Sequence, residues 1–295
     1  MGLEKNKVNR ALGLILITLI VGFAAIILLQ ITSVFLGPSK SACTKKVCLS
    51  KFLEGPPAFN DENLRRYITS NFFYKPPGGG GGEGANFKEN VGFNNELEAT
   101  KNYILEFFKR KKNGAFAVLG AGDGEFQDLT IPLEKDFEWS GLLVEPNPEL
   151  FQRLKGKGRN VLLSKNCVSP FAYPALTTLG HPKIDIGDSE DKKFNKLRAT
   201  KIKQLFEDDL DIVDLQIQCI PLENLLYAAG LEKNLDLLVL DMNGSDLDVL
   251  INVKLDILPD IQVSHPLLPL HPSRHGSGSS KWELNWIGRG KLFFG

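Results

Sequence analysis

The stretch Ala115–Pro146, AFAVLGAGDGEFQDLTIPLEKDFEWSGLLVEP, contains the pattern that decides the fold. An apolar run, Phe116–Leu119, breaks into the glycine-rich residues 120–124, and a second apolar run, Leu142–Val144, ends on Glu145. Alternating glycines let a backbone turn tightly and approach a ligand without intervening side chains. An acid about 20 residues further on is the position that contacts ribose hydroxyls in nucleotide-binding βαβ units. The stretch therefore predicts such a unit.

Strands and helices continue to alternate after this stretch. Apolar runs predict further strands at Val161–Leu163 and Leu235–Asp241, and the alternation of apolar and polar residues predicts a half-buried strand at Ile212–Cys219. Helices are expected at 94–108, Glu149–Lys155, Pro221–Ala229 and Asp246–Val253, the second after the N-cap and proline of Asn147-Pro148. This alternation is typical of an α/β fold with a parallel, doubly wound sheet.

Three segments depart from the pattern. Pro132 is expected to interrupt the crossover helix predicted within 128–137, because a proline inside a helix removes a hydrogen bond. Residues 171–210 lack clear periodicity, which favours an insertion loop with one helix around Lys201–Phe206. After Lys254 the regularity stops, and only Lys291–Phe294 resembles an edge strand.

The region from about Asn90 to Ile257 resembles the FkbM-type methyltransferase domain, and most of all its form in the Star-like membrane proteins of invertebrates. The residues that carry the resemblance run in collinear order: 123–154 (DGEFQDLTIPLEKDFEWSGLLVEPNPELFQRL), 158–160 (GRN), 166–170 (NCVSP), 219–223 (CIPLE) and 238–247 (LVLDMNGSDL). The resemblance implies a Rossmann-like S-adenosylmethionine methyltransferase fold over residues 91–295. The C-terminal strands of that fold would be divergent or truncated here.

By resemblance, S-adenosylmethionine would bind at the carboxyl edge of the sheet. The implied cofactor-binding residues are Gly120, Gly122, Asp123, Gly124, Glu145, Asn166 and Cys167. The glycines would line the methionine and ribose, Glu145 would take the ribose diol, and Asn166 and Cys167 would border the adenine. The alternative is that the glycines only make the turn and Glu145 caps neighbouring backbone.

Asp241 is the candidate catalytic acid, because it ends the most apolar strand. The family pattern there is close to D-x-E-G-[AS]-E-L, whereas this chain has DMNGSDL at 241–247. Asn243 therefore replaces an acid, and an amide cannot act as a general base at neutral pH. An impaired or inactive enzyme is expected. Asn243-Gly244-Ser245 is also a glycosylation sequon, which burial inside the fold would leave unused.

Composition excludes several classes of function. The 295 residues carry 35 basic and 35 acidic side chains, so no net charge attracts nucleic acid. The four cysteines make no disulfide framework: Cys43 and Cys48 could pair in an oxidising lumen, while Cys167 and Cys219 are expected to be inert core thiols. No metal site is predicted, and the histidines at 265, 271 and 275 suit a loop better than a metal centre.

The N-terminal part predicts a membrane anchor. Residues 11–37 contain no charged side chain and exceed the roughly 20 residues that cross a bilayer. A cleaved signal would have a shorter apolar region. Residues 1–10 would form a cytosolic tail and the Pro/Gly-rich residues 38–90 a flexible stem. Lysines flank the span on both sides, so the type II orientation rests on the resemblance alone.

Two functions from different classes follow. The first is a Star-like, single-pass type II membrane protein whose methyltransferase-like domain binds a luminal or extracellular cargo protein during transport between endoplasmic reticulum, Golgi and endosome. The second is a membrane-anchored O-methyltransferase that uses S-adenosylmethionine. A luminal domain would have restricted access to this cytosolic cofactor, which favours the first.

Overall fold

The computed structural model describes residues 56–76, 87–206, 211–253 and 262–264, all within one compact unit, Cys48–Gly295. The predicted tail (1–10), anchor (11–37), Cys43–Cys48 pair, histidine loop and edge strand at 291–294 lie outside these residues. Among the described helices, none is both long enough and apolar enough to span a bilayer.

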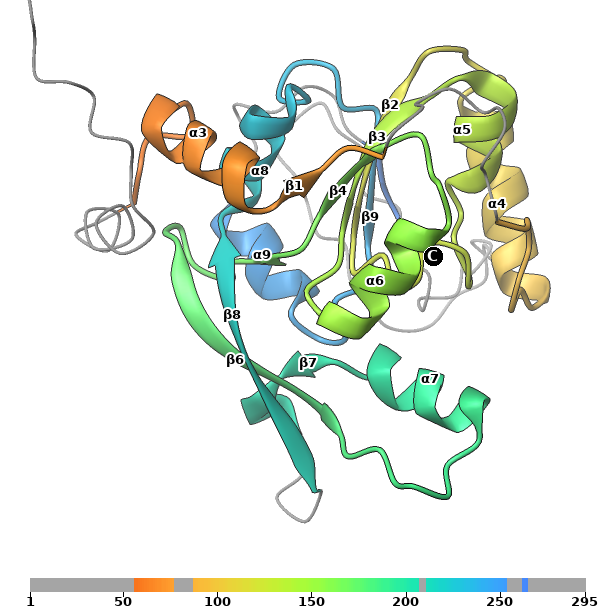
Figure 1. Ribbon diagram of the computed structural model, residues 1–295. Helices are drawn as coiled ribbons and strands as arrows, with labels where there is room; N and C mark the ends of the chain where they lie inside the picture. The colour runs from red at the N-terminus through yellow and green to blue at the C-terminus, as the bar shows by residue number, and fades with distance from the viewer. Residues whose placement is uncertain (1–55, 77–86, 207–210, 254–261, 265–295) are drawn as a thin grey trace, which may run out of the picture. The chain divides into compact units, whose positions relative to one another are not determined.

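A six-stranded sheet forms the centre of the described chain (Figure 1). Its strand order is β1-β4-β3-β2-β9-β10, and all neighbours are parallel except β1 and β4. The strands are β1 (Phe73–Tyr74), β2 (Ala115–Leu119), β3 (Ser140–Val144), β4 (Leu162–Ser164), β9 (Leu237–Leu240) and β10 (Gln262–Ser264). The parallel α/β arrangement is therefore confirmed, as are the strands predicted at 116–119, 142–144, 161–163 and 235–241.

Helices pack on both faces of this sheet (Figure 1). They are α3 (Glu62–Asn71), α4 (Asn95–Phe107), α5 (Ile131–Phe137), α6 (Pro148–Gly156), α8 (Leu222–Ala229) and α9 (Asp246–Asn252). Alternate residues of β2 point to opposite sides: Ala117 and Leu119 pack with α3, α8 and α9, whereas Phe116 and Val118 pack with α4, α5 and α6. A strand that is buried on both faces needs the continuous apolar sequence found here.

Local sequence signals set several helix ends as predicted. Asn147 caps α6, and its side-chain oxygen accepts hydrogen bonds from the backbone of Glu149 and Leu150. Gly230, in the left-handed conformation with φ 73°, ends α8. Pro132, however, does not interrupt a helix, because α5 begins only at Ile131 and tolerates proline in its first turn.

A second sheet occupies the region predicted to be an insertion loop. Its order is β5-β8-β6-β7, with β5 (Cys167–Val168), β6 (Ala175–Pro182), β7 (Lys201–Ile202) and β8 (Ile212–Ile220). The strand predicted at 212–219 is confirmed, although it pairs here rather than in the central sheet. Figure 1 shows this sheet in the lower part of the view, beside α7 (Glu190–Arg198).

The insertion-loop prediction for 171–210 was wrong in two respects. Residues 175–182 form β6, whose partly exposed face gives no continuous apolar run. The helix lies at 190–198 rather than 201–206, where the chain forms β7 and a short 3-10 turn, Lys203–Leu205. Helix α7 buries only Leu197, so its sequence, EDKKFNKLR, shows no apolar periodicity.

The stem prediction for 38–90 also requires correction in its described part. Asp61 caps helix α3, which packs against α8 through the buried residues Leu64, Tyr67 and Ile68. Strand β1 then pairs antiparallel with β4 at the sheet edge. Residues 56–76 therefore belong to the folded domain, because one apolar face of a short helix is enough to attach them to the core.

Strand β10 corrects the expectation that regularity stops after Lys254. Residues 262–264 pair in parallel with Leu237–Val239 and extend the sheet beyond β9. Three residues are too few for a periodic signal, so sequence reasoning missed this strand.

Candidate functional site

A small cavity lies where the carboxyl ends of β2, β3 and β9 face the second sheet. Its volume is about 70 Å³. The central sheet supplies Gly120, Gly122, Glu145 and Asp241, and the second sheet supplies Cys167 and other wall residues. Five of the eight predicted site residues therefore meet here, because parallel strands bring their carboxyl ends to one edge.

The glycine loop after β2 has the tight turn that the sequence predicts. Gly120 has φ +87°, and a β-carbon there would overlap the backbone carbonyl oxygen of Asp241. Gly122 has φ +57° and faces open space, with no atom within 4 Å of a β-carbon built on it. Gly120 thus lets two strand ends approach, while Gly122 leaves the cavity side of the loop bare.

Glu145 is buried and bonded to backbone at both carboxyl oxygens. Oε2 accepts from the N–H of Gly122 at 2.7 Å, and Oε1 accepts from the N–H of Asn147 at 2.7 Å. Burial raises the pKa of Glu145 to about 8; Asp241 also raises it, whereas the backbone bonds and Arg198 lower it. The alternative that Glu145 caps neighbouring backbone describes this arrangement.

Asp123 and Gly124 do not line the cavity. The carboxylate of Asp123 accepts from the backbone N–H groups of Glu125 and Phe126 and lies 3.8 Å from Lys157. A β-carbon at Gly124 would overlap the side chain of Leu154. Both residues shape the loop from the side away from the cavity.

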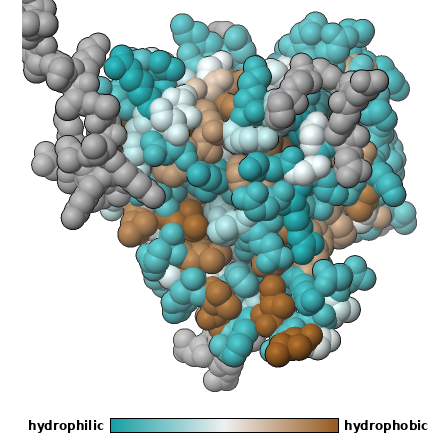
Figure 2. All heavy atoms as spheres, viewed as in Figure 1, coloured by the Kyte–Doolittle hydropathy of each residue, from teal (hydrophilic) through white to brown (hydrophobic). Residues whose placement is uncertain are grey.

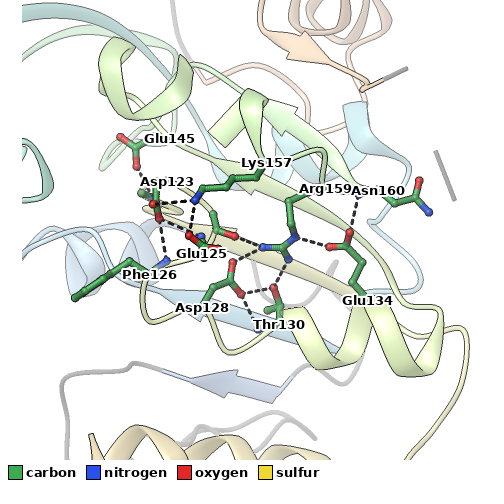
Figure 3. A network of polar contacts seen from close by, with 12 residues as sticks. Asp123, Glu125, Phe126, Asp128, Thr130, Glu134, Glu145, Lys157, Arg159 and Asn160 are labelled. Atoms are coloured by element: carbon green, nitrogen blue, oxygen red, sulfur yellow. Dashed lines mark hydrogen bonds and ion pairs between the residues drawn. The ribbon is translucent and has the colours of Figure 1, made fainter. Parts of the chain in front are cut away.

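A buried charge network fixes the outer side of this loop, and sequence reasoning missed it (Figure 3). Arg159 is fully buried and bonds Asp128 at 2.7 Å, Glu134 at 2.6 Å and the carbonyl oxygen of Gly124 at 2.5 Å. Thr130 accepts a further bond. The only sequence signal was the Gly158-Arg159-Asn160 motif. The network ties α5 and the glycine loop to the turn before β4.

Asn166 and Cys167, the predicted adenine border, differ in position. Asn166 is fully buried, bonds Ser164 and the carbonyl oxygen of Cys167, and does not line the cavity. Cys167 does line it and forms a disulfide with Cys219, so the prediction of two inert thiols was wrong. The parallel pairing of β5 with β8 sets the two cysteines opposite each other, with Cα atoms 4.4 Å apart.

The segment from the end of α7 through β7 supplies cavity residues that the sequence did not suggest. Arg198, Thr200, Lys201 and Ile202 all line the cavity. The side-chain amide of Asn243 donates to the carbonyl oxygens of Arg198, at 2.9 Å, and Thr200, at 3.1 Å. Asn243 therefore holds this segment in place.

The cavity in this conformation does not fit S-adenosylmethionine. Sites for ligands of that size usually have about 300–1,000 Å³, whereas this cavity has about 70 Å³. Glu145, the residue that the resemblance assigns to the ribose diol, already accepts a backbone bond at each oxygen. Arg198 and Lys201 line the cavity and add positive charge, which disfavours a cationic ligand such as S-adenosylmethionine. Among the described residues, no group of three histidine, cysteine or acidic side chains could hold a metal ion.

Comparisons with known proteins found no match: no family model, no curated protein and no solved structure resembles the chain significantly.

Proposed function

We propose that this chain is a Star-like, single-pass type II membrane protein whose FkbM-type domain binds a cargo protein in the secretory pathway. The domain would lie in the lumen of the endoplasmic reticulum, Golgi or endosome. It would act by contact and not by methyl transfer. Two features support this proposal. Residues 11–37 form an apolar segment, and the cavity of the methyltransferase-like domain is too small for the cofactor.

The order of the central strands supports the methyltransferase-like assignment. Counted along the chain from β2, the order β4-β3-β2-β9-β10 is third, second, first, fourth and fifth. This is the order of the doubly wound Rossmann sheet, in which ligands bind where the order reverses. The reversal here lies between β2 and β9, beside Gly120 and Asp241.

The loss of methyl transfer is inferred mainly from the hydrogen bonds of Glu145. Both of its oxygens are bonded to backbone N–H groups within its own domain, at 2.7 Å each. These bonds use one acceptor position on each oxygen and fix the orientation of the carboxyl group, so only the remaining lone pairs are left for the two hydroxyl donors of a ribose diol. The small cavity and the replacement of an acid by Asn243 point in the same direction.

The Cys167–Cys219 disulfide supports a luminal location. Disulfides persist in secretory compartments and on the cell surface, and they are rare in the reducing cytosol. The bond joins residues 52 positions apart, so it closes a long loop around the second sheet.

The surface of the second sheet supports contact with another protein. Figure 2 shows apolar side chains among hydrophilic ones in the lower part of the view, where Figure 1 places this sheet. Its strands and adjoining turns expose Leu176, Ile186, Leu205 and Val213. Exposed apolar groups of this kind, rimmed by polar residues, are typical of protein-binding surfaces.

The second candidate remains an anchored O-methyltransferase, and two observations favour it. Gly122 leaves open space beside the loop, and Asp241 lines the cavity at a strand end. Calorimetry on the full chain in detergent, with millimolar S-adenosylmethionine, separates the candidates. We expect no binding heat; saturable heat would overturn the proposal and support the methyltransferase.

Topology tests the luminal location separately. Asp185→Asn together with Gly187→Ser places a glycosylation sequon around fully exposed Ile186. Gly187 has open space for a side chain. Expressed as the full chain in animal cells, the variant should gain one glycan that endoglycosidase removes. A variant that stays unmodified would contradict a luminal domain.

A further inference from the structure

The residues from the end of α7 through β7, Arg198–Ile202, line one side of the cavity and are called the strap. Arg198, Thr200, Lys201 and Ile202 all contribute to the cavity wall. The strap therefore decides how far the cavity opens toward the second sheet. The way it is attached determines which ligands the cavity can accept.

The two ends of the strap are attached to different parts of the domain. At one end, Arg198 stacks 4.3 Å from the ring centre of Phe126 and donates to Gln127 at 2.9 Å, both in the loop after β2. At the other end, β7 pairs with β6, with Ile202 opposite Leu179. These contacts fix the ends, while in the middle the backbone N–H groups of Ala199 and Thr200 bond back to α7.

Side-chain amides hold the middle. Asn243 Nδ2 donates to the carbonyl oxygens of Arg198 and Thr200, at 2.9 and 3.1 Å. Asn147 Nδ2 donates to Thr200 Oγ1 at 2.8 Å, and Thr200 is itself buried. One amide from the end of β9 and one from the end of β3 therefore bind the strap to the edge of the central sheet.

Asparagine suits position 243 for two physical reasons. Its φ of 53° lies in the left-handed region, which asparagine, aspartate and glycine tolerate better than other residues. Its carboxamide carries two hydrogens, one for each carbonyl oxygen. An ionised carboxylate carries none and would repel both carbonyls, so the geometry requires the amide.

We propose that Asn243 is the latch that holds the strap against the cavity and so sets the size of ligand that can enter. With the latch released, the strap would move about its two attached ends and widen the cavity. An adenosine-sized ligand would then have room beside Gly122 and Asp241. The latch is a property of the chain itself and goes beyond the proposed function.

Hydrogen exchange on the full chain tests the latch directly. Asn243→Asp removes both donors at nearly constant shape, and Asn243→Gly removes them without adding buried charge or straining the backbone. Asn252→Asp is the matched control, because Asn252 also donates to two carbonyl oxygens, those of Pro170 and Asp248, but away from the cavity. The N–H of Thr200, bonded to Leu197, reports on the strap.

We expect both Asn243 variants to speed exchange in 198–202 by about ten- to thirtyfold, the loss of two ordinary hydrogen bonds, while β2 and β9 stay protected. Asn252→Asp should leave the strap unchanged. Unaltered strap exchange in both Asn243 variants, or acceleration spread evenly over the central sheet, would overturn the latch. Calorimetry of Asn243→Gly with S-adenosylmethionine then measures ligand access: binding that is absent from the wild-type chain supports the size filter, and no binding overturns it. Calorimetry on the wild-type chain tests the proposed function, and the Asn243 variants test the latch, so either proposal can fail without the other.

Discussion

Glu145 Oε2 accepts a 2.7 Å hydrogen bond from the backbone N–H of Gly122, which joins the acid at the end of β3 directly to the glycine loop after β2. The resemblance implies that Gly122 lines the ribose and that Glu145 binds its diol, whereas here the two residues bond to each other. The bond keeps the carboxyl group buried beside Asp241, and its consequences can be measured.

Stability should depend on the ionisation of Glu145. Burial raises its folded pKa to about 8, above the ordinary value near 4.5, so the folded state binds the extra proton between those values. The free energy of unfolding should therefore be highest below pH 4.5 as far as this group is concerned, and fall as the pH rises toward 8, by at most about 1.4 kcal/mol per pH unit. Denaturant unfolding at several pH values measures the slope.

Glu145→Gln should flatten that slope, because an amide does not titrate. Glu149→Gln, at an exposed glutamate on the next helix, is the control and should keep the wild-type slope. An equal slope in wild type and Glu145→Gln would show that this carboxyl group ionises normally in the folded state.

Arg159→Met should destabilise the fold severely. The substitution leaves Asp128 and Glu134 buried without their cation, and breaking such a pair costs about 3–5 kcal/mol. Chemical denaturation measures the loss. Arg153→Met removes a partly exposed arginine paired with Glu149 and should cost about 1 kcal/mol or less. Similar losses in both variants would refute the role given to the buried network.

Gly120→Ala should destabilise by more than about 3 kcal/mol or prevent folding, because the new β-carbon meets the Asp241 carbonyl at a positive φ. Gly156→Ala, at the end of α6, meets no atom within 4 Å and should be neutral or slightly stabilising. Thermal melts of the two variants make the comparison. A well-folded Gly120→Ala protein would mean that the two strand ends separate easily.

Removing the disulfide should cost about 2–4 kcal/mol, because Cys167 and Cys219 close a loop of 52 residues in the unfolded chain. Denaturant unfolding of the Cys167→Ala, Cys219→Ala double variant measures this. Reductant should lower the stability of the wild-type chain to that of the variant and leave the variant unchanged. Alkylation of both cysteines in the native, unreduced protein would contradict the bond.

The sequence by itself determined the middle strands of the central sheet. Strands β2, β3 and β9 are buried on both faces, so they must be continuously apolar, and such runs are visible without any structure. The glycine turn was equally readable, because Gly120 needs a conformation that other residues avoid. These two signals place Gly120, Gly122, Glu145 and Asp241 at one edge.

Only the tertiary structure decided the second sheet, the partners of the polar side chains and the closing of the cavity. Strands β6 and β8 are half exposed, so neither has a long apolar run, and their pairing is what brings Cys167 to Cys219. Where the carboxyl oxygens of Glu145 and the amide of Asn243 point depends on neighbours distant in sequence, including Thr200. Sequence spacing decides which residues reach the edge of a parallel sheet, but contacts between distant segments decide which groups those residues bind.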